Sequence, residues 1–352
     1  MNLYCTSDDI GLATGGGIVT YYESSFMASM GPTIILGRQQ LPKPEIRSPF
    51  IQDAELYKKI MELQQTNNII KFNKALFYSG SFPASIQLLK HQGTKIAHTC
   101  AAHDPKISRQ EHVMYGVDYD ASYPHLSDAN LNLLYTKCFR DVDLVICPST
   151  HSASIMKAFG CQKIKVIPHG CTLPPEVVPM PKKFTIGYLG QVGPDKGLKY
   201  LLTAWNILKD SEIDLKIRCS DKQVLKDINN KYGGHPADID GRVENTSELY
   251  NNISVYVSSS CTEGFGIPVL EAMAHGRPVI CSKNTGASDL VHHGHNGFIV
   301  PSKDPYAIAD CVLELKRNPE LVQKMGQAAR EIAKDYTWDK IGQQYIETMR
   351  SL

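Results

Sequence analysis

This sequence of 352 residues lacks the features that mark membrane-spanning and secreted proteins. No apolar run approaches the ~18 residues that a membrane-spanning helix needs, and residues 1–9 contain neither a basic region nor an apolar one. We therefore expect a cytoplasmic protein, and we leave open peripheral contact with the inner face of the membrane. An excess of one charge is missing too, because 37 basic and 36 acidic residues nearly cancel. Bulk charge thus gives no reason to expect a nucleic-acid partner.

Paired cysteines are also lacking, although the chain has ten cysteines. None forms a Cys-x-x-Cys pair, which argues against zinc-ribbon and thioredoxin-type sites. We expect reduced thiols, since several cysteines, such as Cys147, lie in apolar segments. Two Asp-x-Asp sequences, at 141–143 and 238–240, and the histidine-rich stretch 292–295 contain the residue types of metal ligands. We favour a structural or surface role for all three and expect no metal site.

Short apolar segments rich in β-branched residues alternate with longer amphipathic segments along the whole chain. This alternation is typical of β–α units that build a parallel sheet, so the predicted fold class is α/β. The expected strands are residues 2–6, 33–36, 75–78, 95–101, 143–147 and 164–167 in the first half, and 184–189, 214–218, 253–258, 278–281 and 298–300 in the second half.

A proline-rich segment separates these two sets of strands. Residues 168–183 contain five prolines, each of which removes a backbone donor and fixes φ, so neither a helix nor an inner strand is expected there. The chain is also longer than one hydrophobic core usually supports. We therefore predict a first domain over 1–173, a linker over 174–183 and a second domain over 184–335.

Glycines follow the first expected strand of each domain. Residues 15–17 are all glycine, while Gly190 ends the strand expected at 184–189 and is followed by Lys196-Gly197. Glycines between a strand and a helix let a phosphate approach the N–H groups at the helix N-terminus. Neither segment has the dinucleotide or the P-loop fingerprint, which argues against a dehydrogenase, and a simple turn explains residues 15–17 equally well.

The most distinctive segment is Thr262–Ala274. Gly264 and Gly266 precede an apolar stretch and would leave N–H groups accessible to a phosphate or a sugar hydroxyl at the start of a helix. Glu263 and Glu271 supply the fixed acceptors that sugar and ribose hydroxyls require. The pattern indicates a site for a nucleotide sugar, and hence glycosyl transfer.

These motifs resemble those of family four of the retaining glycosyltransferases, and the resemblance covers nearly the whole chain. Residues 165–170 resemble the end of that family's first domain, and Tyr188–Gln191 with Lys196 resembles the opening of its second domain. The pair Glu263 and Glu271 matches the family's two glutamates separated by seven residues. The resemblance implies the GT-B fold, in which two Rossmann-like domains face a central cleft, with a C-terminal helix at 336–352 that crosses back to the first domain.

The resemblance also implies a role for individual residues. Glu263 would contact the transferred sugar, Glu271 the ribose, and His103 the side of the 6-hydroxyl, while Lys196 would neutralise the diphosphate leaving group. The implied catalytic residues are Glu263, Lys196 and His103, and the implied donor-binding residues are Gly16, Gly17, Gln191, Phe265, Gly266, Ile267 and Glu271.

One residue departs from the family's pattern. The family commonly has Gly-Arg where this chain has Gly190-Gln191. Either Gln191 donates neutral hydrogen bonds in place of the arginine, another residue supplies the cation, or the activity is reduced.

The expected function is transfer of a hexose, with retention and without a metal, from a nucleoside-diphosphate sugar to a hydroxyl of a glycan, a lipid or a small molecule. The donor sugar is a substrate, and no further cofactor is expected. Three alternatives stay open: a sugar phosphorylase, a nucleotide-sugar epimerase, and a non-catalytic protein that binds a nucleotide or a glycan.

Overall fold

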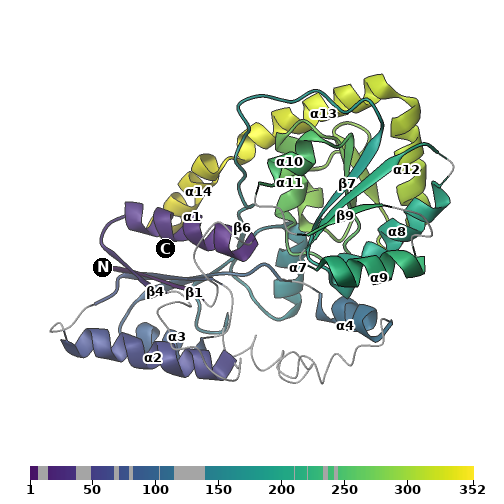
Figure 1. Cartoon of the computed structure of the whole chain (residues 1–352). Helices are drawn as coiled ribbons and strands as arrows, with labels where there is room; N and C mark the ends of the chain where they lie inside the picture. Colours follow the sequence, from purple (N-terminus) through teal and green to yellow (C-terminus); the bar gives the residue numbers. More distant parts are fainter. Residues whose placement is uncertain are drawn as a thin grey trace. The chain divides into compact units, whose positions relative to one another are not determined.

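The computed structural model describes residues 1–6, 15–36, 49–66, 71–78, 82–102, 104–114, 139–209, 211–219, 221–232, 237–241 and 245–352. These residues form two compact units (Figure 1). Unit 1 takes its residues from Met1–Ala102, Asp118–His169 and Trp338–Leu352, and unit 2 takes its residues from His103–Val117 and Gly170–Thr337.

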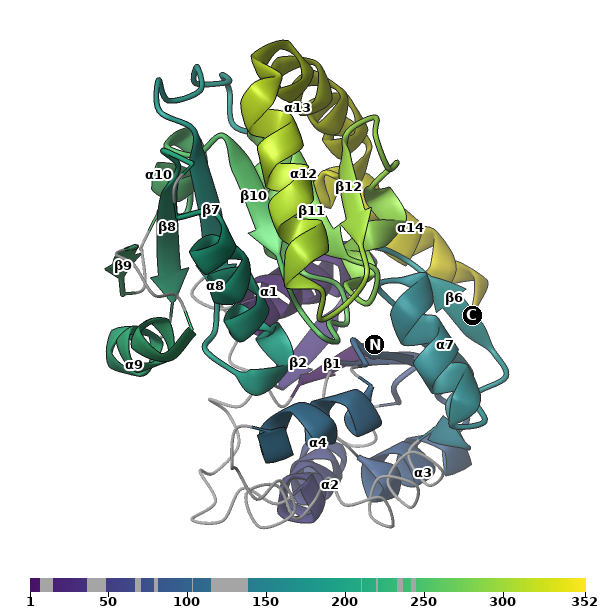
Figure 2. The ribbon, with the colours of Figure 1, turned by 90° about the vertical axis from the view of Figure 1, so that its right-hand side faces the viewer.

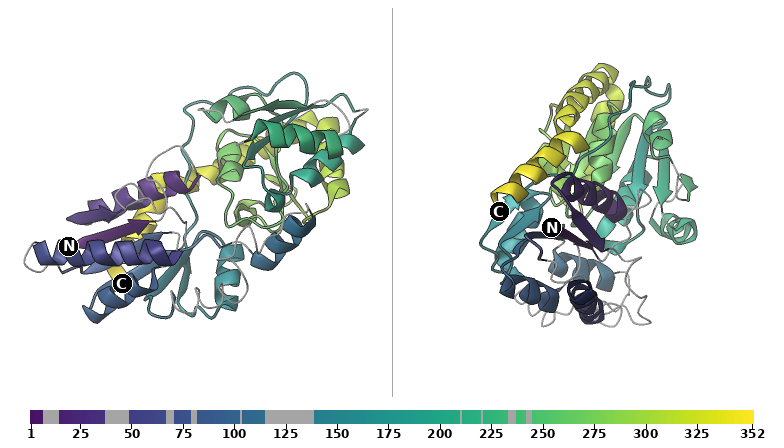
Figure 3. Two further views of the ribbon diagram at one scale, coloured as in Figure 1. Left: turned by 60° about the horizontal axis from the view of Figure 1, so that its bottom comes forward. Right: turned by 90° about the vertical axis from the view of Figure 1, so that its left-hand side faces the viewer.

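Unit 1 contains a parallel sheet of six strands in the order β2-β1-β3-β4-β5-β6. The strands are β1 (Asn2–Thr6), β2 (Thr33–Leu36), β3 (Lys74–Tyr78), β4 (Lys95–Thr99), β5 (Leu144–Cys147) and β6 (Ile164–Val166). The helices are α1 (Gly15–Ser29), α2 (Pro49–Thr66), α3 (Pro83–His91), α7 (Thr150–Ala158) and α14 (Trp338–Ser351). Helices α1 and α14 cover one face of the sheet, and α2 and α3 cover the other (Figures 1 and 3).

The C-terminal helix α14 packs on α1 in unit 1. The ring of Trp338 stacks on that of Tyr22, with the ring centroids 4.2 Å apart. A Cβ atom at Gly342 would lie 2.3 Å from the ring of Phe26, so this close approach of the two helices requires glycine. The residues at the end of the chain are thus part of the same core as those at its beginning.

Unit 2 contains a second parallel sheet of six strands, in the order β12-β11-β10-β7-β8-β9. Its strands are β7 (Thr185–Gly190), β8 (Asp214–Cys219), β9 (Asp238–Asp240), β10 (Val255–Ser258), β11 (Val279–Ser282) and β12 (Gly297–Val300). Its α-helices are α4 (Pro105–Met114), α8 (Leu198–Ile207), α9 (Lys222–Tyr232), α10 (Ser247–Asn251), α11 (Ile267–Ala274), α12 (Pro305–Arg317) and α13 (Pro319–Ala333). Short 3-10 turns lie at η3 (Pro194–Lys196), η4 (Gly286–Leu290) and η5 (Lys334–Tyr336).

The hydrophobic core of unit 2 lies on both faces of its sheet. Along β10, Val255 and Val257 pack in one cluster with α8 and α12, which lie in front of the sheet in Figure 2. Tyr256 packs in the other cluster, with α10 and α11. This division follows from the two-residue period of a strand, whose successive side chains point to opposite faces.

The prediction of two parallel α/β sheets is confirmed, and each of the eleven strands expected from the sequence is present within a few residues of its expected limits. The twelfth strand, β9, was missed. It has the sequence Asp-Ile-Asp and lies at the edge of its sheet, so a single apolar side chain gave no hydrophobic pattern to detect. The Asp-x-Asp sequence at 238–240 is therefore an edge strand.

Two segments group differently from the domain limits expected from the sequence. Residues 104–114, in the first half of the chain, cluster with unit 2, and so do residues 170–183, which include the end of the expected first domain and the whole expected linker. Within the described part of the chain, no helix is both long and apolar enough to cross a membrane. Most cysteines that the structure describes are buried, and burial raises the pKa of the Cys147 thiol to about 12.

The other Asp-x-Asp sequence, at 141–143, also has a structural role. Asp143 precedes β5 and accepts hydrogen bonds from the ammonium of Lys90 at 2.8 Å and from the backbone N–H of Ile96 at 2.8 Å. Burial alone would raise the pKa of Asp143, but Lys90 and the N–H of Ile96 outweigh it and hold the pKa below its usual value. The carboxylate thereby joins β4 to β5.

We expect Asp143→Asn to lower the free energy of unfolding by about 1 kcal/mol, because a charged acceptor is lost from a partly buried site. Since the folded state lowers the pKa of Asp143, its contribution is present at neutral pH and is lost as the pH falls through that pKa. Urea unfolding at neutral pH and at pH values below about 4, the ordinary pKa of an aspartate, measures both effects. Asp141→Asn is the matched control, because Asp141 pairs with the neighbouring and exposed Arg140, at 3.4 Å; equal losses in the two variants would contradict this role.

Candidate active site in unit 2

The centre of the second sheet is a topological switch point. β7 and β10 pair with each other, while the connections that leave them lead to β8 on one side and to β11 on the other. In open parallel sheets, ligands bind beyond the carboxyl ends of the strands at such a point. A ligand-binding site is therefore expected at the loops that follow β7 and β10.

These two loops are joined by their backbones. The N–H of Cys261, after β10, donates to the carbonyl of Asp195, after β7, at 2.7 Å. Gly197 has a φ of +65°, and a Cβ atom there would lie 2.0 Å from the carbonyl oxygen of Ser259. Only glycine permits this conformation and this approach together, so the sequence Lys196-Gly197 fixes where η3 ends and α8 begins.

An ion pair between Lys196 and Glu263 connects the same two loops through their side chains. Both side chains are largely buried, with exposed fractions of 16% for Lys196 and 18% for Glu263. Burial alone would lower the pKa of Lys196, but the carboxylates of Glu263 and Asp195 outweigh it, so the pKa is raised. A fully charged ammonium and a carboxylate acceptor thus lie side by side at the switch point.

The segment that carries Glu263 is held against the loop after β11. The N–H of Glu263 donates to the carbonyl of Asn284 at 3.0 Å, and the carbonyl of Glu263 accepts from the N–H of Gly286 at 2.9 Å. Phe265 is buried, and its carbonyl accepts from the N–H of Ala287 at 2.6 Å. These bonds fix the direction of the chain as it enters α11.

Gly266 begins α11 in a left-handed conformation, with a φ of +93°. Ile267 is the first helical residue and proline follows it, so the helix starts where the sequence predicts. The N–H groups of a first helical turn have no acceptor within the helix, and they carry the positive end of the helix dipole. An anion can therefore bind at this end of α11.

Glu271 lies one turn further along α11. It accepts a hydrogen bond from the hydroxyl of Tyr250 at 2.7 Å. Burial raises the pKa of Glu271, and the bond from Tyr250 acts in the opposite direction. The second glutamate of the motif is thus a half-buried acceptor that is held in place by α10.

Helix α4 supplies residues that the sequence did not single out. The N–H of Asp104 donates to the hydroxyl of Thr262 at 2.8 Å. Glu111 is fully buried and binds Lys303 at 2.7 Å and Lys199 at 2.9 Å. Burial alone would raise the pKa of Glu111, but the two ammonium groups outweigh it and lower the pKa.

These contacts place α4 beside both loops of the site. Lys199 lies on α8, three residues after Lys196, and Thr262 directly precedes Glu263, so two of the three partners of this segment are close in sequence to a member of the ion pair. No local sequence pattern could predict these ion pairs. Glu111 and its partners are far apart in the sequence, and each charge alone is typical of a solvated surface.

The structure brings together part of the predicted set. Lys196, Glu263, Phe265, Gly266, Ile267 and Glu271 all lie on the two loops and on α11 of unit 2. Gln191 follows β7 directly and is exposed, and its carbonyl accepts from the hydroxyl of Tyr188 at 3.3 Å. Gly16 and Gly17 belong to unit 1, in the first turn of α1 at the switch point between β1 and β3.

His103 lies outside the residues that the structure describes. Among the described residues, no group of three or more histidine, cysteine, aspartate and glutamate side chains has an arrangement that could hold a metal ion.

We expect Glu111→Gln to lower the free energy of unfolding by about 3 kcal/mol, because it leaves two lysines beside a buried site without their carboxylate. Chemical denaturation measures the loss. Glu320→Gln, at an exposed position on α13, is the matched control. An unchanged unfolding midpoint for Glu111→Gln would show that the three charges do not hold α4 in unit 2.

Residues 174–332 match the family model of the glycosyl transferases group 1. An uncharacterized glycosyltransferase, MJ1178 of Methanocaldococcus jannaschii, is 29% identical over 158 residues, which are 44% of this chain and 44% of that protein. The capsular polysaccharide biosynthesis glycosyltransferase CapM of Staphylococcus aureus is 28% identical over 177 residues, 47% of this chain and 45% of that protein. The matched segments thus span less than half of these relatives' own length.

Solved structures match the whole chain. Sucrose-phosphate synthase from Thermosynechococcus elongatus has a TM-score of 0.79 at 18% identity, over 99% of this chain and 98% of that one. Anabaena Alr3699/HepE in complex with UDP-glucose has a TM-score of 0.74 at 18% identity, over the full length of both chains. These likenesses establish the fold, which is the one that the motifs predicted. Residues 174–332 are therefore similar to the glycosyl transferases group 1, and the chain has the fold of the GT-B glycosyltransferases.

Proposed function

We propose that this protein transfers a hexose from a nucleoside-diphosphate sugar to an acceptor hydroxyl, with retention of the anomeric configuration and without a metal ion. The observation that carries the proposal is the ion pair of Lys196 and Glu263 at the switch point of unit 2. It lies within the segment that matches the glycosyl transferases group 1. The pair combines a cation for a phosphate with an acceptor for a sugar.

Lys196 would stabilise the leaving group. When the bond between the anomeric carbon and the diphosphate oxygen breaks, negative charge develops on the diphosphate. An ammonium fixed in a largely buried position stabilises that charge more than it stabilises the bound donor, which is how electrostatic catalysis lowers a barrier. Lys196 supplies this cation from the protein itself, so the proposed reaction needs no metal at the diphosphate.

Glu263 and Glu271 would orient the two ends of the donor. Each carboxylate is fixed by a neighbour, Glu263 by Lys196 and Glu271 by Tyr250. A fixed carboxylate accepts hydrogen bonds from vicinal hydroxyls, which sugars and ribose both present. We assign the transferred hexose to Glu263 and the ribose to Glu271.

The start of α11 would bind the diphosphate from the other side. The backbone N–H groups of Phe265, Gly266 and Ile267 surround the N-terminus of this helix, where negative charge is favoured. Gln191 would donate neutral hydrogen bonds there, in place of the arginine common in the family. Gly16 and Gly17 of unit 1 are proposed to face the donor phosphates, and His103 to face the sugar.

The proposed chemistry requires no covalent intermediate with the protein. The acceptor hydroxyl attacks the anomeric carbon from the face that the diphosphate leaves, so one C–O bond forms as the other breaks and the configuration is kept. The proton of the hydroxyl passes to the departing β-phosphate. The roles of Lys196 and Glu263 are therefore to stabilise and to orient.

The ligands of similar solved structures suggest which nucleotide sugar to test first as the donor. Anabaena Alr3699/HepE was solved with UDP-glucose and with UDP, and S. aureus TarM was solved with UDP and α-GlcNAc-glycerol. We therefore propose a uridine-diphosphate hexose as the first donor to test. The acceptor would be a glycan, a lipid or a small molecule.

The test is a transfer assay with UDP-, GDP- and ADP-hexoses and a panel of acceptors, run in the presence of EDTA. We expect transfer without added metal, and we expect Glu263→Gln to lower kcat/KM by a factor of about 10² to 10³, as for loss of one stabilising group in a transition state. The thermal unfolding midpoint should change far less. Glu248→Gln, at an exposed position on α10, is the matched control and should retain full activity.

Other products would identify the alternative functions. Formation of a sugar 1-phosphate from phosphate would indicate a phosphorylase, and interconversion of donors without acceptor would indicate an epimerase. Nucleotide binding without any turnover would indicate a non-catalytic protein. Equal activity in Glu263→Gln and the unaltered protein would remove Glu263 from the site, and loss of transfer in EDTA that magnesium restores would overturn the metal-independent mechanism.

A further inference from the structure

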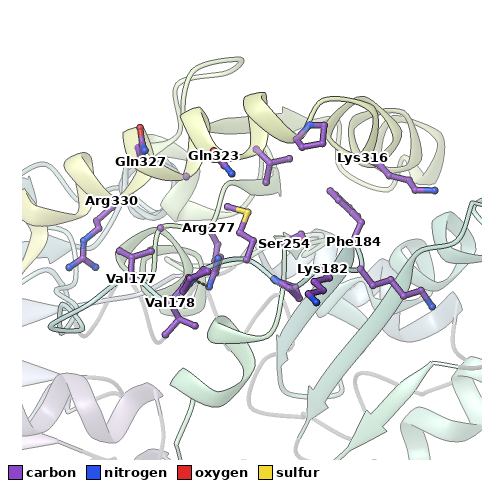
Figure 4. Close-up of a pocket in the computed structure, with 18 of the residues that line it drawn as sticks. Val177, Val178, Lys182, Phe184, Ser254, Arg277, Lys316, Gln323, Gln327 and Arg330 are labelled. Atoms are coloured by element: carbon purple, nitrogen blue, oxygen red, sulfur yellow. Dashed lines mark hydrogen bonds between the residues drawn. The ribbon is translucent and has the colours of Figure 1, made fainter.

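A groove of about 1130 Å³ lies in unit 2 between residues 177–184 and helix α13 (Figure 4). Its wall includes Phe184, Ser254 and Arg277. Phe184 and Ser254 directly precede β7 and β10, and Arg277 lies two residues before β11. Because all strands of a parallel sheet start at the same edge, the groove lies at the amino ends of the strands. Lys196 and Glu263 lie beyond the carboxyl ends, so the groove is separate from the candidate active site.

One side of the groove is apolar and open to solvent. Val177 and Val178 have exposed fractions of 44% and 40%, and Pro179, Met180 and Phe184 continue the same wall. Exposed apolar side chains gathered along a cavity are typical of ligand sites. The groove can therefore contact an apolar part of a ligand.

The groove also contains cations without carboxylate partners. Lys182, Arg277, Lys316 and Arg330 line it, and none of them has a carboxylate within 4.0 Å among the residues that the structure describes. Figure 4 shows Arg277 and Arg330 toward one end and Lys182 and Lys316 toward the other.

Backbone carbonyls hold three of these cations in place. Arg330 donates to the carbonyls of Ala274 and Pro174, and Lys316 donates to that of Ser211. A carbonyl oxygen orients a cation but carries only a partial charge, so it does not neutralise it. Each of these side chains also retains further N–H donors, because a guanidinium has five and an ammonium three.

Arg277 has the least compensated charge of the set. Its side chain is fully buried, Nε donates to the carbonyl of Tyr250, and Nη2 donates to that of Val178. Nη1 is buried and has no hydrogen-bond partner. Burial lowers the pKa of Arg277 to about 10, as expected for a guanidinium with no anion beside it.

The acidic residues of the groove do not balance this charge. Glu331 pairs with Lys334 at 2.6 Å, and Glu212 is exposed at the rim of the groove. A fifth cation, Lys183, is paired with Asp214 at 2.6 Å. The remaining four cations give the groove a positive potential beside its apolar wall.

We propose that this groove is a second binding site, which takes a phosphate ester attached to an apolar group. The cations bind the phosphate, and Val177, Val178 and the side chains beside them contact the apolar part. Such a ligand is either a lipid with a phosphate headgroup or a free phosphorylated molecule, and the two sources share the chemistry that the groove recognises.

The test measures binding of hexyl phosphate to the full chain by calorimetry, and co-sedimentation with phosphatidylcholine vesicles that contain phosphatidic acid. We expect hexyl phosphate to bind, and Lys182→Glu to weaken binding about tenfold, as for loss of one charge-assisted hydrogen bond. Lys182→Gln should have a smaller effect in the same direction. Lys324→Glu, an exposed position on α13 outside the groove, is the matched control and should leave binding unchanged.

The calorimetry and the vesicle co-sedimentation together identify the source of the ligand. Vesicle binding that requires phosphatidic acid and is lost in Lys182→Glu indicates a lipid headgroup, and binding of hexyl phosphate alone indicates a free ligand. The proposal is overturned if neither probe binds, if Lys182→Glu and Lys324→Glu weaken binding equally, or if UDP displaces hexyl phosphate. None of these outcomes depends on transfer activity, so the groove and the proposed function succeed or fail separately.

Discussion

The ion pair of Lys196 and Glu263 is the interaction on which the candidate active site depends. It joins the loops that follow β7 and β10, which are the two strands at the switch point of the second sheet. The backbone bond from Cys261 to Asp195 and the close approach of Gly197 to Ser259 bring the same loops together. With the loops fixed, a cation, a carboxylate and the N-terminus of α11 lie on connected segments, where we propose that a diphosphate and a sugar bind.

Part of this support comes from the first half of the sequence. Helix α4 binds unit 2 through Glu111, whose buried carboxylate pairs with Lys199 and Lys303, and through Asp104, whose N–H binds Thr262. Lys199 and Thr262 are close in sequence to Lys196 and Glu263. The two halves of the chain therefore share the construction of one site, in addition to forming a sheet each.

Much of the fold could be predicted from hydrophobic patterns, because buried parallel strands are continuous apolar segments. β9 could not, since an edge strand with one apolar residue lacks that pattern. The motif from Glu263 to Glu271 was informative because its glycines and carboxylates are close in sequence. The contacts of Glu111 and the cations of the groove join residues that are distant along the chain, and no local pattern reveals such pairings. The assignment of residues 104–114 to unit 2 was unpredictable for the same reason.

The central claim is that Lys196 binds the diphosphate while it is paired with Glu263, so that the two residues are energetically coupled. The direct measurement is a double-mutant cycle, in which calorimetry gives the affinity for UDP of the unaltered protein, Lys196→Ala, Glu263→Gln and the double variant. Because the carboxylate and the diphosphate compete for one ammonium, the account predicts tighter binding to Glu263→Gln, weaker binding to Lys196→Ala, and a coupling energy of about 1 kcal/mol or more. Additive effects of the two substitutions, or an affinity that neither substitution changes, would contradict it.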